Sequence, residues 1–173
     1  AYIMSNLIIN LNDLQKLRQY NDINHNNNRI QYSTIDPIRC RVLTQIEELE
    51  FMDPKTTSLA NFYMCNIKIK NIPIFVDIFN KQPQDVSIVV KIDENVYDSV
   101  FRKGTVSVQR GDLCEMTLVT WSPQENCDST TDLWEVVDMK FLTLKDVETL
   151  HNFLLSDNGR QFLEISNPVQ NIT

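Results

Sequence analysis

Apolar and polar residues alternate along five separate stretches of this 173-residue chain. Alternation with a period of two is the pattern of a strand that buries one face and leaves the other in water. It predicts strands at 39–51, 61–70, 86–92, 113–121 and 133–141. In the second stretch Tyr63, Cys65, Ile67 and Ile69 are expected to point inward. In the last one we expect Leu133, Val137, Met139 and Phe141 to share a face. Half-buried strands of this kind are typical of an antiparallel sheet.

The period changes to that of a helix at Leu144. Leu144, Val147, Leu150 and Leu154 are spaced by three and four, which predicts an amphipathic helix over 144–155 with this stripe against the chain's own barrel. Thr143 is the expected N-cap, and Asp146 completes a capping-box-like start. The sequence Asp157-Asn158-Gly159 is expected to interrupt the helix before an apolar pattern resumes over 160–165.

Shorter signals fill in the rest of the chain. Helices are expected at 13–20, with Leu14 and Leu17 as a narrow apolar stripe, and just after residue 93, with Asp93 or Asn95 as the cap. The polar segments 21–34, 53–55 and 122–131 read as loops or turns, and residues 74–79 as a short apolar insert.

The order of the expected elements indicates the fold class. Helix, three strands, short helix, two strands and helix is the order of a single OB fold, a five-stranded Greek-key barrel with flanking helices. A doubly wound fold would need a helix after most strands, and too few are expected. We expect residues 1–3 to be a cloning remnant, 4–167 to form the OB domain and 168–173 to be a tail.

Charge and composition narrow the function. The net charge of −7 and a pI near 4.8 disfavour a protein that binds nucleic acid mainly by itself, since phosphate contacts require a basic surface. They favour a protein partner, and leave room for a few phosphate contacts. No apolar run is long enough to span a membrane, and the first residues do not read as a signal peptide. Of the four cysteines, three fall in strand-like segments, where we expect buried free thiols.

Candidates for catalysis are scarce. The three glycines are too far apart for a phosphate-binding loop, and the two histidines, His25 and His151, have no Cys, His or carboxylate at ligand spacing. Carboxylate pairs such as Glu47-Glu48 and Asp93-Glu94 read as solvating charge. We therefore expect no catalytic residue, metal or cofactor, and a protein that is not an enzyme.

Two candidate binding surfaces remain. An OB barrel commonly binds single strands through basic and aromatic residues on its strands. The basic candidates are Arg39, Arg41, Lys68, Lys70 and Lys91, with Tyr63 or Trp121 nearby. The alternative is that these are merely solvated outer positions. At the C-terminus, the apolar residues exceed what one helix face needs, and exposed apolar surface favours a partner. The candidates for partner contact are Leu150, Phe153, Leu154, Leu155, Phe162 and Ile165.

Three segments carry a family resemblance: MSNLIINLNDLQKLRQYNDINHNN, FYMCNIKIKNI and LWEVVDMKFLTLKDVETLHNFLLSDNGRQFLEISN. They resemble, in order and over residues 4–167, the Ten-one family of budding yeasts. Ten-one is the smallest subunit of the CST telomere-capping complex, whose other members are Stn-one and Cdc-thirteen.

The resemblance implies a specific function. A Ten-one-like chain would pair with the N-terminal OB domain of Stn-one, in a heterodimer similar in plan to two subunits of replication protein A. The contact would fall on 144–155 and 162–165. The complex would act in the nucleus at telomeres, bind the G-rich single strand mainly through its largest subunit, and engage DNA polymerase α–primase. Two hypotheses stay open: an adaptor that acts through its C-terminal helix, and an OB protein that itself binds single-stranded DNA.

Overall fold

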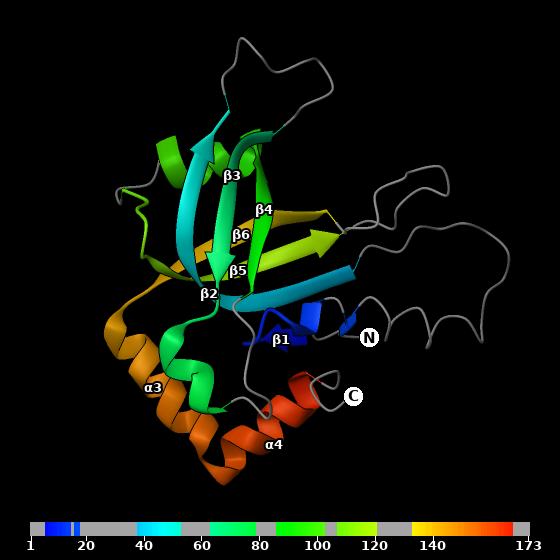
Figure 1. Ribbon diagram of the computed structural model, residues 1–173, viewed down its shortest axis with the longest axis vertical. Helices are drawn as coiled ribbons and strands as arrows, with labels where there is room; N and C mark the ends of the chain where they lie inside the picture. The colour runs from blue at the N-terminus through cyan, green and yellow to red at the C-terminus, as the bar shows by residue number, and fades with distance from the viewer. Residues whose placement is uncertain are drawn as a thin grey trace, which may run out of the picture.

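The strands of the chain form one closed barrel (Figure 1). The computed structural model describes residues 6–14, 16–17, 38–52, 63–78, 86–102, 107–120 and 133–167. Within them lie β1 (Asn6–Ile8), β2 (Ile38–Phe51), β3 (Tyr63–Lys70), β4 (Ser87–Asp93), β5 (Leu113–Thr120) and β6 (Trp134–Leu142). The strand order is β1-β2-β3-β4-β6-β5, and β5 pairs back onto β2. This closed path through β2 to β6 confirms the predicted OB fold, to which β1 adds a sixth strand.

The length of β2 makes the closure possible. Its first half, from Ile38 to Gln45, pairs antiparallel with β5. Its second half, from Gln45 to Phe51, pairs antiparallel with β3. One strand therefore belongs to both walls of the barrel, and the parallel pairing of β4 with β6 seals the remaining gap. The short β1 lies parallel to the first half of β2.

The first hydrophobic cluster fills the inside of this barrel. Most of the predicted inward residues are buried in it, whereas Tyr63 is only partly buried. Its strand members are Ile8, Ile38, Cys40, Val42, Ile46, Cys65, Ile67, Ile69, Val90, Ile92, Cys114, Met116, Leu118, Trp134, Val136 and Met139. The predicted helical residues Leu14 and Leu17 pack on the same cluster, where residues 13, 14, 16 and 17 are helical.

The predicted inward face of the last strand is partly wrong. Leu133 and Val137 are exposed, and the buried residues are Trp134, Val136 and Met139. The cause is a β-bulge: Thr117 pairs with Asp138 and Leu118 with Val136, so Val137 has no partner. An extra residue in one strand reverses which alternate positions face the core. A strict period of two therefore fails across residue 137.

Helical segments cover both ends of the barrel. The short α2 (Glu94–Tyr97) is capped by Asp93, whose carboxylate accepts a hydrogen bond from Val96 N at 2.9 Å, and it continues as the π-helical η2 (Asp98–Arg102). At the other end lie the 3₁₀ helix η1 (Pro73–Ile78) and the two helices α3 (Leu144–Leu155) and α4 (Asp157–Ser166) (Figure 1). The predicted loops at 21–34, 53–55 and 122–131, which contain His25 and Cys127, lie outside the described residues, as does Trp121 at the end of a predicted strand.

Candidate protein-binding surface and strand face

The start of α3 is fixed locally by a capping box, as predicted. Asp146 N donates to Thr143 Oγ1 at 3.1 Å, and Thr143 N donates to the Asp146 carboxylate at 2.9 Å. Two hydrogen bonds with Thr143 lower the pKa of Asp146, and the bond from the Thr143 backbone has a larger effect than the bond with its side chain. Two orphan N–H groups are thus satisfied at the first turn, so the helix begins at Leu144.

The end of α3 leads into α4 without a loop. Ser156 N and Ser156 Oγ both donate to Phe153 O, at 3.0 and 2.5 Å, and Ser156 Oγ accepts from Gly159 N at 3.1 Å. Ser156 therefore ends one helix and caps the next. We expected the helix to be interrupted over 157–159, but these residues form the first turn of α4. A serine between two apolar helical runs is the signal for this double cap.

Gly159 allows the sharp turn between the two helices. A Cβ at this position would lie 1.8 Å from Phe153 O and 2.7 Å from the Cα of Leu154. Only hydrogen fits in that space, because real Cβ atoms do not approach so closely. The small residue sets the angle at which α4 leaves α3, and with it the contact between the rings of Phe153 and Phe162, whose centroids are 5.9 Å apart.

One stripe of each helix packs against the outside of the barrel. Val147 and Leu154 from α3 and Leu163 from α4 are buried there. They form a second hydrophobic cluster with residues from β1, β2 and the segment around η1: Leu7, Ile9, Leu43, Ile72 and Phe75. Leu150 and Phe162 are partly buried at its edge. The helical layer is therefore anchored on the chain's own barrel by a continuous core.

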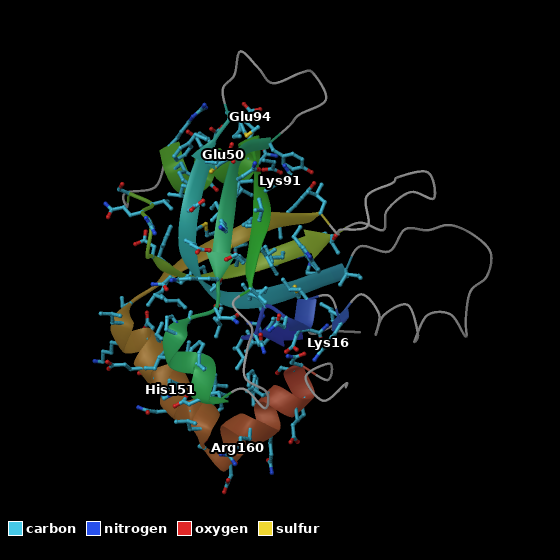
Figure 2. All side chains as sticks on the ribbon, in the orientation of Figure 1. Lys16, Glu50, Lys91, Glu94, His151 and Arg160 are labelled. Carbon is cyan, nitrogen blue, oxygen red and sulfur yellow. The ribbon has the colours of Figure 1, made fainter. Side chains whose placement is uncertain are left out.

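A polar contact joins α3 to η1 beside this cluster. His151 Nε2 lies 2.8 Å from Asp77 Oδ1, and the imidazole ring stacks on Phe75 with 6.3 Å between centroids. His151 is marked on α3 in Figure 2. The two contacts hold η1 against one flank of α3. The other flank, which carries Phe153, remains open to α4.

The apolar residues that the helices leave in solvent form the candidate protein-binding surface. The exposed fractions are 75% for Leu144, 43% for Phe153, 38% for Leu155 and 75% for Ile165. On the neighbouring η1, Ile74 and Val76 are exposed as well. Exposed apolar side chains of this kind mark interaction sites when they are contiguous.

Two expectations about individual residues are wrong. Leu154 was a candidate for partner contact, but it is 1% exposed and lies in the second cluster. Leu144 was expected to face the barrel, but it lies on the helix surface. The stripe predicted over 144–155 placed both residues against the barrel, which is confirmed for Leu154 and wrong for Leu144, because helical spacing defines a stripe without fixing which edge of it meets the barrel. The docking of η1 against His151 fixes that edge.

The remaining candidates fall on two flanks of the buried stripe. Successive residues of an α-helix are turned by about 100°, so Phe153 and Leu155 project on opposite sides of Leu154. Phe153 contacts Phe162, whereas Leu155 follows His151 by one turn on the side of η1. The aromatic part of the described surface is therefore the pair Phe153–Phe162. The exposed Ile165 lies beside this pair on α4, the helix that carries Phe162.

The basic strand residues lie on the outer face of the barrel, and two of them contact acids. Arg41 Nη1 is 3.4 Å from Glu115, and Lys68 Nζ is 4.0 Å from Glu47. Arg39 is exposed and Lys70 half-buried. Neighbouring acids therefore offset part of the positive charge that the sequence placed on this face.

Tyr63 and Lys91 form the aromatic and cationic part of this strand face. The Lys91 ammonium lies 5.3 Å from the centre of the Tyr63 ring and also donates to Asn66 at 3.3 Å. The Tyr63 hydroxyl donates to the Glu135 carboxylate. Burial, then the hydrogen bond and the charge of Glu135, raise the pKa of Tyr63. The ring is thus occupied by groups of the chain itself.

The described residues include three buried cysteines but no cluster of metal ligands. No group of three His, Cys, Asp or Glu side chains within them is placed to bind a metal ion. No helix among them is long and apolar enough to cross a membrane. Cys40, Cys65 and Cys114 are buried free thiols, as expected. Burial raises the pKa of Cys65 to about 11 and that of Cys114 to about 12, so both are protonated and inert at neutral pH.

The fold defines the chain as an OB-fold protein with an added C-terminal helical layer. No protein-family model and no curated protein matches the sequence. Among solved structures, a chain in the crystal structure of yeast Stn1 and Ten1, the proteins written above as Stn-one and Ten-one, matches with a TM-score of 0.58 and 18% identity. The match covers 94% of this chain and 97% of that one.

A second solved structure is more distant. It is the mitochondrial single-stranded DNA binding protein Rim1 of S. cerevisiae, with a TM-score of 0.40 and 14% identity, covering 63% of this chain and 98% of that one. The comparison of folds therefore relies on the Stn1–Ten1 structure. That likeness agrees with the Ten-one resemblance of the sequence.

Proposed function

We propose that this chain is the Ten-one-like subunit of a telomere-capping complex and acts as an adaptor rather than an enzyme. In this role it pairs with the N-terminal OB domain of an Stn-one-like protein. The sequence resemblance and the fold of the Stn1–Ten1 structure support the partner. Its place would be the nucleus, at telomeres, with Cdc-thirteen and DNA polymerase α–primase engaged through the complex.

The observation that carries the proposal is the apolar surface left by α3 and α4. Val147, Leu154 and Leu163 already anchor the helices on the barrel. Phe153 and Ile165 are therefore not needed for that anchoring, and they remain exposed. Aromatic residues in the centre of a partly apolar patch are the usual hot spots of protein interfaces.

Direct binding of single-stranded DNA by the chain alone is the weaker alternative. The contact of Lys91 with Tyr63 favours it, since strand aromatics and cations bind single strands. The contacts of Arg41, Lys68 and Tyr63 with carboxylates, and the net charge of −7, disfavour it. Titration with single-stranded telomeric DNA at low and moderate salt decides between the two. Sub-micromolar binding by the isolated chain would reject the adaptor-only role.

The adaptor proposal is tested by coexpression with the N-terminal OB domain of Stn-one and by measuring the mass and Kd of the complex. We expect a one-to-one heterodimer. Phe153→Asp and Ile165→Asp should each weaken it by about 2 kcal/mol or more, which is roughly thirtyfold in Kd.

The matched control is Val137→Asp. Val137 is 39% exposed, close to the 43% of Phe153, but lies in the bulge of β6. Its change should leave pairing intact. Equal loss in the control and in both test variants, or no loss in either test variant, would contradict the assignment of the surface. Circular dichroism of each variant checks that the barrel is folded.

A further inference from the structure

The end of the barrel away from α3 and α4 carries three aromatic rings in mutual contact. Phe51 is the last residue of β2, Tyr97 ends α2 and Phe101 belongs to η2. Tyr97 and Phe101 are stacked, with centroids 5.0 Å apart and 11° between planes. Phe51 stands edge-on to both, at 6.4 and 5.8 Å. Each pair has a geometry that aromatic rings prefer, so the three rings hold one another in place.

The rings do more than close the barrel. Tyr97 and Phe101 are partly buried against the inner cluster and cap it. Phe51, by contrast, is 54% exposed, and its side chain adds an apolar ring to the surface beside them. Phe101 lies in a π-helical turn, a conformation that is frequent at functional sites. A fixed, exposed ring on an aromatic base is suited to receive an apolar side chain from outside.

The charges at this end identify the chemistry of the partner. The cation Lys91 also lies at this end (Figure 2), but its ammonium is already held by Asn66 and the Tyr63 ring. Glu50 and Glu94 are exposed at the same end of the barrel (Figure 2). No ion pair joins either of them to another described residue, whereas Asp98 is paired with Arg102 at 2.8 Å. The Arg102 guanidinium also lies 5.2 Å from the centre of the Tyr97 ring, so the chain's own cation occupies that ring and Phe51 is the ring left open. Two carboxylates without an ion pair among the described residues repel phosphate and attract lysine or arginine.

We propose that this aromatic end, formed by Phe51, Tyr97 and Phe101 with Glu50 and Glu94, docks a basic segment of a partner protein. An aliphatic side chain of the segment packs on Phe51, and lysine or arginine residues beside it approach the two glutamates. The surface lies away from α3 and α4. The chain can therefore hold this segment and a second protein on its helical surface at once, and the proposal does not depend on the function proposed above.

The test is selection of the full chain against a random linear peptide library displayed on phage. We expect the enriched peptides to carry lysine or arginine on both sides of an aliphatic residue. A synthetic peptide of that consensus should lose about tenfold or more in affinity with Phe51→Ala. It should lose a similar amount with the double variant Glu50→Lys, Glu94→Lys, which leaves the aromatic rings in place.

The matched control is Glu148→Lys with Glu164→Lys, two exposed carboxylates on α3 and α4. It makes the same change in net charge and should retain binding, which separates a local site from general attraction to an acidic protein. The proposal is overturned if the enriched peptides lack basic residues. It is equally overturned if the control loses as much affinity as the test variants, or if a single-stranded oligonucleotide binds in a Phe51-dependent way.

Discussion

The two hydrophobic clusters on either side of β2 are built from similar residues but are closed differently. Val42 points into the barrel and its neighbour Leu43 points out beneath the helices. Strands surround the inner cluster on every side, since β5 pairs back onto β2. Among the described residues, the outer cluster is covered by α3, α4 and η1. A helix buries one stripe, and its flanks remain in solvent. Six of the ten exposed large apolar side chains among the described residues lie on these three segments.

This difference separates stability from recognition within one chain. Most apolar residues of the barrel strands are buried and serve the fold, and the exposed Phe51 is an exception. The helical layer shares its apolar residues between the fold and the outside, and Leu154 and Phe153 show the division at adjacent positions. A surface that is already anchored on a rigid barrel needs little ordering when a partner binds, which favours affinity.

The largest expected effect comes from opening either cluster. Ile67→Ala in the barrel and Leu154→Ala in the helical layer should each cost about 2–5 kcal/mol of unfolding free energy, because both side chains are fully buried. Since β2 contributes to both clusters, we expect one cooperative transition in each variant. Hydrogen exchange of β3 and α3 amides checks this. Loss of protection in α3 alone after Leu154→Ala would show that the layer opens separately.

A smaller effect is expected from adding one methyl group at the turn between the helices. Gly159→Ala places a Cβ 1.8 Å from Phe153 O, so α4 must move. We expect a loss of about 1–3 kcal/mol in stability, and weaker pairing as well, because the Phe153–Phe162 contact depends on this turn.

Gly111→Ala is the control for that change. Gly111 has φ +93° with open space around it, so alanine there is strained by about 1–2 kcal/mol without touching the helices. Denaturant unfolding and the Kd for the partner are measured on both variants. If Gly111→Ala reduced pairing as strongly as Gly159→Ala, the helix turn would have no special role in binding.

The capping box has a moderate effect that is confined to the helical layer. Thr143→Ala removes the hydroxyl that accepts from Asp146 N and should cost about 1 kcal/mol. Thr149→Ala, at an exposed position inside α3, should be neutral or slightly stabilising, since alanine favours helix. Thermal unfolding of the two variants compares them. Equal destabilisation would show that the cap contributes nothing beyond side-chain packing.

The smallest expected effect is a pH dependence of the stability, which arises where the two ends of the described chain meet. Asn167 Nδ2 donates to the Asp13 carboxylate at 3.0 Å, and Lys16 lies 3.7 Å from it. Burial outweighs these contacts and raises the pKa of Asp13 above its ordinary 3.8. The pKa of this carboxyl is therefore higher in the folded chain than in the unfolded chain. Its contribution to the free energy of unfolding is greatest at a pH below the unfolded-state pKa and is lost as the pH rises through the folded-state pKa.

Asp13→Asn should remove that loss. The variant should gain stability relative to the natural chain as the pH is raised above about 4, and the gain should level off once Asp13 is ionised. Urea unfolding at several pH values measures it. Asp138→Asn, an exposed carboxylate on β6, controls for the change in net charge. A difference that does not vary with pH would contradict the role of burial at Asp13.

Local signals in the sequence were enough to predict most of the elements. Alternation located β2 to β6, and the order of strands and helices gave the OB class. Thr143, Asp146 and the spacing of apolar residues predicted α3 with the bounds that the structure shows, Leu144–Leu155. These features depend on residues a few positions apart, and the physics that produces them is equally local.

The tertiary structure decided how those elements use their faces. The bulge at Val137 reverses the buried face of β6 because of its pairing with β5. The exposure of Leu144 and the burial of Leu154 depend on η1 and β1, which reach α3 from distant parts of the chain. The sequence by itself determined that the C-terminal helices carry surplus apolar residues. Only packing against the barrel decided which of them remain exposed, because burial is set by neighbours that no local pattern contains.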